Sequence, residues 1–189
     1  MKKKTPQLSL EDIKDELRRV GAAGTIFVEG DLCRRAWKPH AETFMRGDDM
    51  DYNPEAVVPL KKTLLRLEQL FPCHTTLWRR RPDHPEAQEP LLYGSFASPD
   101  GIMKPPNRNY KLPPLSRELS IVFLKGKPAW KQKTGTDGSR GFELKKTRVA
   151  AGDIRKPVLL QHYVPIKDSL GEIAAALEIY VIAVPGSAK

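Results

Sequence analysis

Residues 157–184 read PVLLQHYVPIKDSLGEIAAALEIYVIAV, and this stretch decides the fold. Its first part, residues 157–166, alternates between two faces as an extended segment does. Residues 172–184 are rich in Ile and Val, which favours a second long strand. The intervening KDSLG has turn chemistry, with Gly171 at a position suited to a positive φ. The stretch therefore predicts two long antiparallel strands at the centre of a sheet.

The N-terminal region, residues 1–56, predicts one helix and a short strand. Ser9 is suited to cap a helix, because Asp12 follows three residues later and acidic residues fill the first turn. Apolar residues then recur at helical spacing until Gly21 and Gly24, which we expect to end the helix. The next apolar run, residues 25–28, predicts a strand. As an appendage, this region fits an extra helical layer, a dimerisation element or a flexible arm.

Residues 57–189 are predicted to form the main domain. An apolar stripe with a helical period ends at Pro72 and predicts a helix before it. The further elements are expected in the following order: strands over 74–80 and 91–97, a Pro- and Gly-rich loop over 98–114, a helix over 115–123 and a strand over 129–133. This order predicts an α+β fold, in which helices pack on an antiparallel sheet.

Two short motifs resemble bacterial sensor domains of the PAS, GAF and Cache families. Residues 124–130, LKGKPAW, are similar to the helix, Gly-x-Pro, strand step of those domains. Residues 164–173, VPIKDSLGEI, are similar to their PI-x-D-x-x-G-x-I hairpin. The resemblance extends over residues 57–184 and implies a ligand pocket between the sheet and the loop and helix before it. Cache domains usually lie between membrane-spanning helices, and this sequence has no apolar run of that length.

The resemblance places this pocket among five residues: Tyr93, Arg117, Trp130, His162 and Arg80. Arg117, at the start of the short helix, would hold a carboxylate through two hydrogen bonds. The aromatic residues and His162 would supply walls and hydrogen-bonding groups. The implied ligand is a small polar or anionic molecule, and the sequence names no cofactor. The alternative is that the aromatic residues belong to the core and Arg117 is an exposed helix residue.

The net charge of +9, from 32 Lys and Arg against 23 Asp and Glu, admits an anionic partner such as nucleic acid. The densest cluster, Arg79, Arg80 and Arg81, follows Trp78 and would bind phosphate next to a stacked base. Residues 9–51 would complete the same positive face. On a strand, however, Arg80 faces away from the other two arginines, which also fits a charged, solvent-exposed edge.

No enzyme or metal motif is present in the sequence. It has no G-x-S-x-G, P-loop or G-x-G-x-x-G, and the Cys and His spacings match no standard zinc site. Cys73 and His74 are neighbours, so on a strand they point to opposite faces and make no catalytic pair. Residues 135–141 suit a phosphate-binding loop or, more simply, a hairpin turn. We therefore predict no catalytic residues and no metal site.

The N-terminus lacks the apolar core of a signal peptide, which predicts a cytoplasmic protein. The hypothesis is a sensory or regulatory module that binds a ligand and acts through a signalling protein partner or a second copy of itself. The alternative is a basic regulator associated with nucleic acid.

Overall fold

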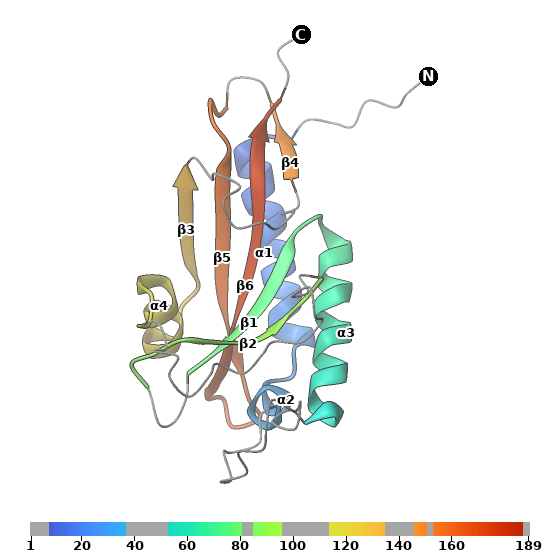
Figure 1. The fold of residues 1–189 in the computed structure, drawn as a ribbon, viewed down its shortest axis with the longest axis vertical. Coiled ribbons are helices and arrows are strands. Elements are labelled where there is room, and N and C mark those ends of the chain that lie inside the picture. The colour runs from blue at the N-terminus through green and yellow to red at the C-terminus, as the bar shows by residue number, and fades with distance from the viewer. Residues whose placement is uncertain are drawn as a thin grey trace, which may run out of the picture.

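A computed structural model describes residues 8–36, 53–80, 85–95, 114–134, 146–150 and 153–186. The described residues form four helices and six strands (Figure 1). In chain order these are α1 (Leu10–Phe27), α2 (Gly30–Arg35), α3 (Pro54–Leu70), β1 (His74–Arg79), β2 (Glu89–Tyr93), α4 (Arg117–Lys125), β3 (Ala129–Thr134), β4 (Lys146–Val149), β5 (Val158–Lys167) and β6 (Ile173–Pro185). The sequence motifs on residues 37–52, 98–113 and 135–145 lie outside the described residues.

The strands form one sheet in the order β2-β1-β6-β5-β3, and every pairing along this path is antiparallel. Strands β5 and β6 pair from Val158↔Ala183 to Lys167↔Ile173, so the predicted central hairpin is confirmed. Gly171 in its turn has a φ of 81°. The short β4 pairs in parallel with the end of β6, next to β1 along the same edge of that strand. The α+β prediction, with helices packed against a largely antiparallel sheet, is confirmed.

The two faces of the sheet differ in what covers them. Helices α1 and α3 pack on one face, here called the helical face, and their buried residues share one apolar core with alternate residues of β5 and β6. Helix α4 packs on the opposite side, here called the α4 face, over a smaller cluster that includes Tyr163 and Ala176. Figure 1 shows α1 behind the sheet and α4 in front of it. The helical face is therefore mainly apolar, whereas the α4 face carries a larger share of polar residues.

Helix α1 begins as predicted but runs further than expected. Ser9 caps it in a reciprocal capping box with Asp12. The prediction that it ends near Gly21 and Gly24, followed by a strand over 25–28, is wrong, because the helix continues to Phe27. Gly24 faces the sheet so closely that a Cβ there would lie 2.2 Å from Cδ2 of Leu177. The glycine permits close packing of α1 on β6, and this packing outweighs its low helix propensity.

The N-terminal region contributes to the same core as the main domain. Ile13, Leu17 and Val20 of α1 are fully buried among residues of the sheet and of α3. Of the three roles considered for residues 1–56, the described part forms a helical layer, while the domain boundary at residue 56 stays a prediction.

Strand β2 also differs from expectation: it starts at Glu89 and ends at Tyr93. The described part of the chain contains no helix that is long and apolar enough to cross a membrane.

Candidate functional site

A buried polar cluster lies on the α4 face, centred on Glu178 in the middle of β6. Glu178 is only 5% exposed, and β6 lies between β1 and β5 at this point of the sheet. Oε2 of Glu178 accepts a hydrogen bond from Nε1 of Trp78 on β1 at 2.7 Å. Oε1 accepts from the Tyr163 hydroxyl at 3.0 Å and from Nε2 of Gln161, both on β5. We call Trp78, Gln161, Tyr163 and Glu178 the Glu178 cluster.

The electrostatics of this cluster are those of a carboxyl group held away from water. Burial raises the pKa of Glu178, and the hydrogen bonds from Trp78, Gln161 and Tyr163 act against that rise. Burial also raises the pKa of the Tyr163 hydroxyl, and the neighbouring carboxylate adds to the effect. Within the described part of the chain, all three hydrogen-bond donors to Glu178 are neutral groups.

Further polar and aromatic side chains lie next to the Glu178 cluster on the α4 face, on the side toward β2. Thr76 lies opposite Glu178 in the register of β1 and β6, and His74 lies opposite Tyr180, so all four share the α4 face. The rings of His74 and Tyr180 are 5.4 Å apart, and Nδ1 of His74 is 3.1 Å from the Ser95 hydroxyl. His74, Thr76 and Glu178 are all buried, so the α4 face has a polar, hydrogen-bonded interior at the centre of the sheet.

The structure brings together only two of the five predicted pocket residues. The rings of Trp130 and His162 stack at 4.2 Å with an angle of 13° between their planes. They lie on the helical face, where Nδ1 of His162 is 3.3 Å from the Leu17 carbonyl oxygen of α1. Burial lowers the pKa of His162 to about 4. This pair is therefore separated by the sheet from the α4 face on which the resemblance implies a pocket.

The other three predicted residues lie apart from that pair. Tyr93 lies opposite Thr76 in the register of β1 and β2, on the same face as Glu178, and its carbonyl oxygen accepts a hydrogen bond from Lys61. Arg117 is the first residue of α4. Arg80 follows β1 and donates from Nε to the Pro85 carbonyl oxygen at 3.0 Å. Tyr93 and Arg117 thus border the α4 face, whereas Arg80 is held at the end of β1.

The arginine run does not form one free cationic surface in the described residues. Arg79 forms an ion pair with Glu89 at 2.6 Å, and both side chains are largely buried. Arg80 lies just after β1, where its guanidinium is bonded to the Pro85 carbonyl oxygen. Arg81 lies outside the described residues. The positive charge of Arg79 is therefore compensated within the fold.

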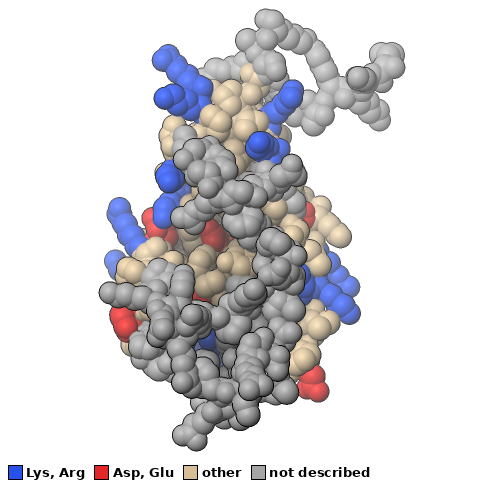
Figure 2. Space-filling model, in the orientation of Figure 1, with Lys and Arg blue, Asp and Glu red and all other residues tan. Residues whose placement is uncertain are grey.

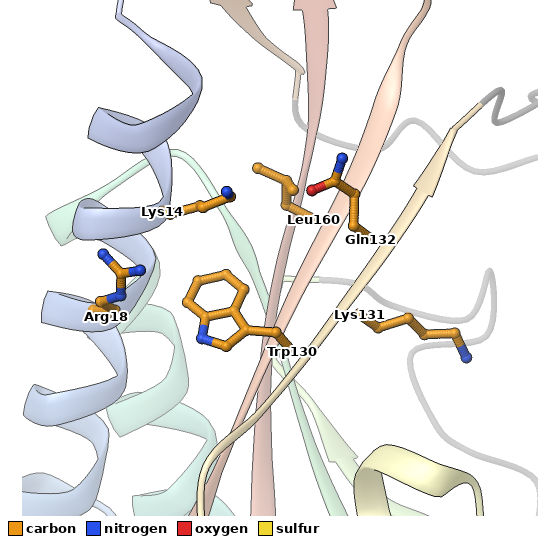
Figure 3. Close-up of a pocket in the computed structure, with 6 residues that line it drawn as sticks. All are labelled: Lys14, Arg18, Trp130, Lys131, Gln132 and Leu160. Atoms are coloured by element: carbon orange, nitrogen blue, oxygen red, sulfur yellow. The ribbon is translucent and has the colours of Figure 1, made fainter.

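A second feature is an open groove of about 240 Å³ between α1 and β3 (Figure 3). Its lining residues are Lys14, Arg18, Trp130, Lys131, Gln132 and Leu160. The Arg18 guanidinium lies 5.5 Å from the centre of the Trp130 ring. Lys14 and Arg18 also pair with Glu11, at 3.2 and 3.1 Å. The groove is therefore mixed in character, with an apolar floor and a basic rim.

The sequence interpretation missed the Glu178 cluster. Its signal was present, because Glu178 is the only charged residue in the apolar run of residues 173–184. A single buried acid in a central strand requires donors from other strands, and the alternation of β5 placed Gln161 and Tyr163 on the face opposite His162.

Metal and thiol chemistry has little basis in the described residues. They contain no group of three or more His, Cys, Asp or Glu side chains arranged to hold a metal ion. Cys33 and Cys73 are both buried thiols, and burial raises the pKa of the Cys33 thiol to about 12. His40 and His84, which the sequence places near these cysteines, lie outside the described residues.

Comparison with protein-family models, curated proteins and solved structures found no significant match to the chain.

Proposed function

We propose that this chain is a cytoplasmic sensory or regulatory module of PAS-like fold, which binds a small polar ligand and passes its state on through protein contact. The observation that carries the proposal is the Glu178 cluster. It lies on the face of the sheet next to α4, where the resemblance to PAS and Cache domains implies a ligand pocket. The opposite face is filled by the apolar core under α1 and α3.

The strand order supports the PAS-like part of the proposal. If the short β4 is set aside, the remaining strands can be numbered one to five along the chain. They then lie in the order second, first, fifth, fourth, third, which is the strand order of the PAS fold. The predicted hairpin supplies the fourth and fifth of these strands. The sheet order therefore agrees with the resemblance that the two short motifs suggest.

The chemistry of the cluster favours a ligand that carries hydrogen-bond donors, above all a cationic amine. In the described structure Oε1 of Glu178 accepts two hydrogen bonds and Oε2 accepts one, so Oε2 can accept one more. Lys131 acts on this carboxyl group through its charge, without a hydrogen bond to it among the described contacts. Tyr180 and His74 would line the same surface. Arg117 at the edge of the α4 face would suit a carboxylate on the same ligand.

A ligand screen tests this function. Purified full-length protein is heated with amino acids, small amines, carboxylates and nucleotides, and hits are measured by calorimetric titration at constant pH. We expect one class to bind, with a loss of affinity in Glu178→Gln of about tenfold or more, because a charged hydrogen bond contributes about 1.5–3 kcal/mol. The control Glu16→Gln alters an acidic residue of α1 and leaves the affinity unchanged. Binding that is equal in both variants, or no binding across the panel, argues against a ligand site at Glu178.

The nucleic-acid alternative gains no specific support from the described residues. Arg79 is ion-paired with Glu89. Figure 2 looks onto the α4 face and shows the described Lys and Arg side chains spread around the outline of the molecule, not gathered in one tract. Its test is binding of the purified protein to duplex and single-stranded DNA at increasing salt: binding that fades with salt supports this alternative, and no binding at low salt removes it.

A further inference from the structure

Strand β3 forms an edge of the sheet. It pairs with β5 from Ala129↔Tyr163 to Thr134↔Val158, and no other described strand pairs with its outer side. In antiparallel pairing, alternate residues direct their N–H and C=O groups to the partner strand and the others direct them outward. The outer side of β3 therefore presents a row of main-chain groups that another extended chain can bind.

The groove described above runs beside this edge and gives it side-chain selectivity. Trp130 and the fully buried Leu160 form an apolar floor on the helical face of β3 and β5. Figure 3 shows Lys14 and Arg18 directed from α1 toward this floor, whereas Lys131 points away from it. A strand added to β3 would place every second side chain over the groove and the others on the opposite face. The groove is suited to apolar side chains of moderate size.

The charged side chains of β3 determine which kind of strand can pair with its outer side. Lys131 and Lys133 lie on the α4 face of β3, where both are partly or fully exposed. The one ion pair described for this strand joins Lys131 to Glu118 at 3.7 Å. A second copy of β3 would bring these lysines close to their equivalents, and like charges on facing strands are destabilising. Acidic side chains at the same positions would be stabilised.

We propose that the outer edge of β3 binds an extended acidic peptide segment by strand addition. The apolar side chains of the segment lie over the groove beside the partly exposed Trp130, and its carboxylates face Lys131 and Lys133. Single-stranded nucleic acid fits less well, because the Trp130 ring already stacks on His162 and lies under Arg18, which leaves little ring surface for a base. Lys131 lies opposite Gln161 of the Glu178 cluster in the register of β3 and β5, but the proposal does not depend on the proposed function.

The first experiment uses a fluorescein-labelled peptide of alternating Val and Glu with the full-length protein, measured by fluorescence anisotropy. We expect saturable binding and a loss of about tenfold or more in the double variant Lys131→Glu, Lys133→Glu, because two favourable charge contacts become repulsive. The matched control Lys62→Glu, Arg66→Glu makes the same change of net charge on the exposed side of α3 and retains the affinity. Circular dichroism verifies that both variants are folded. Equal losses in both variants would show general charge attraction and overturn the proposal.

The second experiment separates strand addition from attraction by charge alone. Two further peptides have the same sequence with N-methyl groups either on all Val residues or on all Glu residues, so that each lacks the N–H donors of one side. Only one set of N–H groups can face β3, so one methylated peptide should lose binding and the other should retain it. The idea fails if both methylated peptides bind like the parent. It also fails if a labelled oligothymidine binds more tightly and displaces the peptide.

Discussion

Nε1 of Trp78 lies 2.7 Å from Oε2 of Glu178, although Trp78 is paired in the sheet register with Ala176. The indole thus reaches diagonally across strands β1 and β6 to the buried carboxyl group. Diagonal contacts of this length are within the range of aromatic side chains on neighbouring strands. The bond joins residues 100 positions apart in the chain, so it is formed only when the sheet is complete.

A double-mutant cycle measures this bond. We expect Trp78→Phe and Glu178→Met to be coupled by about 0.5–3 kcal/mol in urea unfolding at pH 7, the range spanned by hydrogen bonds to neutral and to charged groups. The cycle cancels the effects that each substitution has on its other neighbours. Circular dichroism provides the signal, since one tryptophan is removed. A coupling near zero would mean that the indole and the carboxyl group do not interact.

His162 should make the protein less stable in mild acid. Burial holds its pKa at about 4, below the ordinary value near 6.5. The folded protein therefore binds this proton less readily than the unfolded chain. The stability contributed by His162 is complete above pH 6.5 and is lost as the pH falls toward 4, with a slope approaching about 1.4 kcal/mol per pH unit. We expect His162→Phe, which retains a ring against Trp130, to remove this slope, as measured by urea unfolding from pH 7.5 to 4.5.

Trp130→Phe is the control for that experiment, because it keeps the histidine and a ring that packs on it. It should be less stable than the wild type but show the same dependence on pH. If His162→Phe and Trp130→Phe give the same slope, the acid sensitivity comes from other groups.

Glu178 should have an effect of the opposite sign. Its pKa is raised in the folded protein, mainly by burial. The stability that this carboxyl group contributes is therefore complete below its unfolded pKa, about 4.3, and is lost as the pH rises through the folded value. Relative to the wild type, Glu178→Gln should gain stability as the pH is raised above about 4.3. Because His162 obscures this trend, the comparison is best made in the His162→Phe background, by urea unfolding. A constant difference between the two proteins would contradict a raised pKa.

The sequence predicted best those elements whose causes are local. The hairpin of β5 and β6 follows from alternation and from the turn around Gly171, whose positive φ confirms the reason for the prediction. The start of α1 follows from Ser9 and Asp12, which are three residues apart. In both cases the interactions that define the element lie within a few residues, so a single stretch of sequence contains the information.

Features that depend on distant contacts were missed. Gly24 would ordinarily end a helix, but its contact with Leu177, on a strand far along the chain, explains why the helix continues. Trp130 and His162 were both expected in a pocket, and they do stack, yet the side of the sheet on which they lie depends on the register of β3 and β5. The importance of Glu178 depends likewise on donors from two other strands.

The contact between α2 and the β5–β6 turn is close enough for a glycine to be required. A Cβ at Gly30 would lie 2.2 Å from the carbonyl oxygen of Lys167 and 2.6 Å from the backbone nitrogen of Asp168. Since the clash is with backbone, no side-chain rotation can relieve it. We expect Gly30→Ala to destabilise the protein by about 1–3 kcal/mol, the range for overpacked sites, as measured by urea unfolding.

Gly21→Ala is the matched control, because the nearest neighbours of its added methyl group would be side-chain atoms of His162 and Val164, at 3.1 Å. Small shifts can absorb that contact, and alanine gains about 1 kcal/mol of helix propensity over glycine, so this variant should be nearly neutral. In Gly30→Ala the ion pair of Arg34 with Asp168, 3.1 Å in the wild type, should also weaken as the turn moves away. If Gly30→Ala unfolds at the same urea concentration as the wild type, α2 does not rest on the turn. Its attachment to the sheet would then depend on side-chain contacts such as that of Arg34.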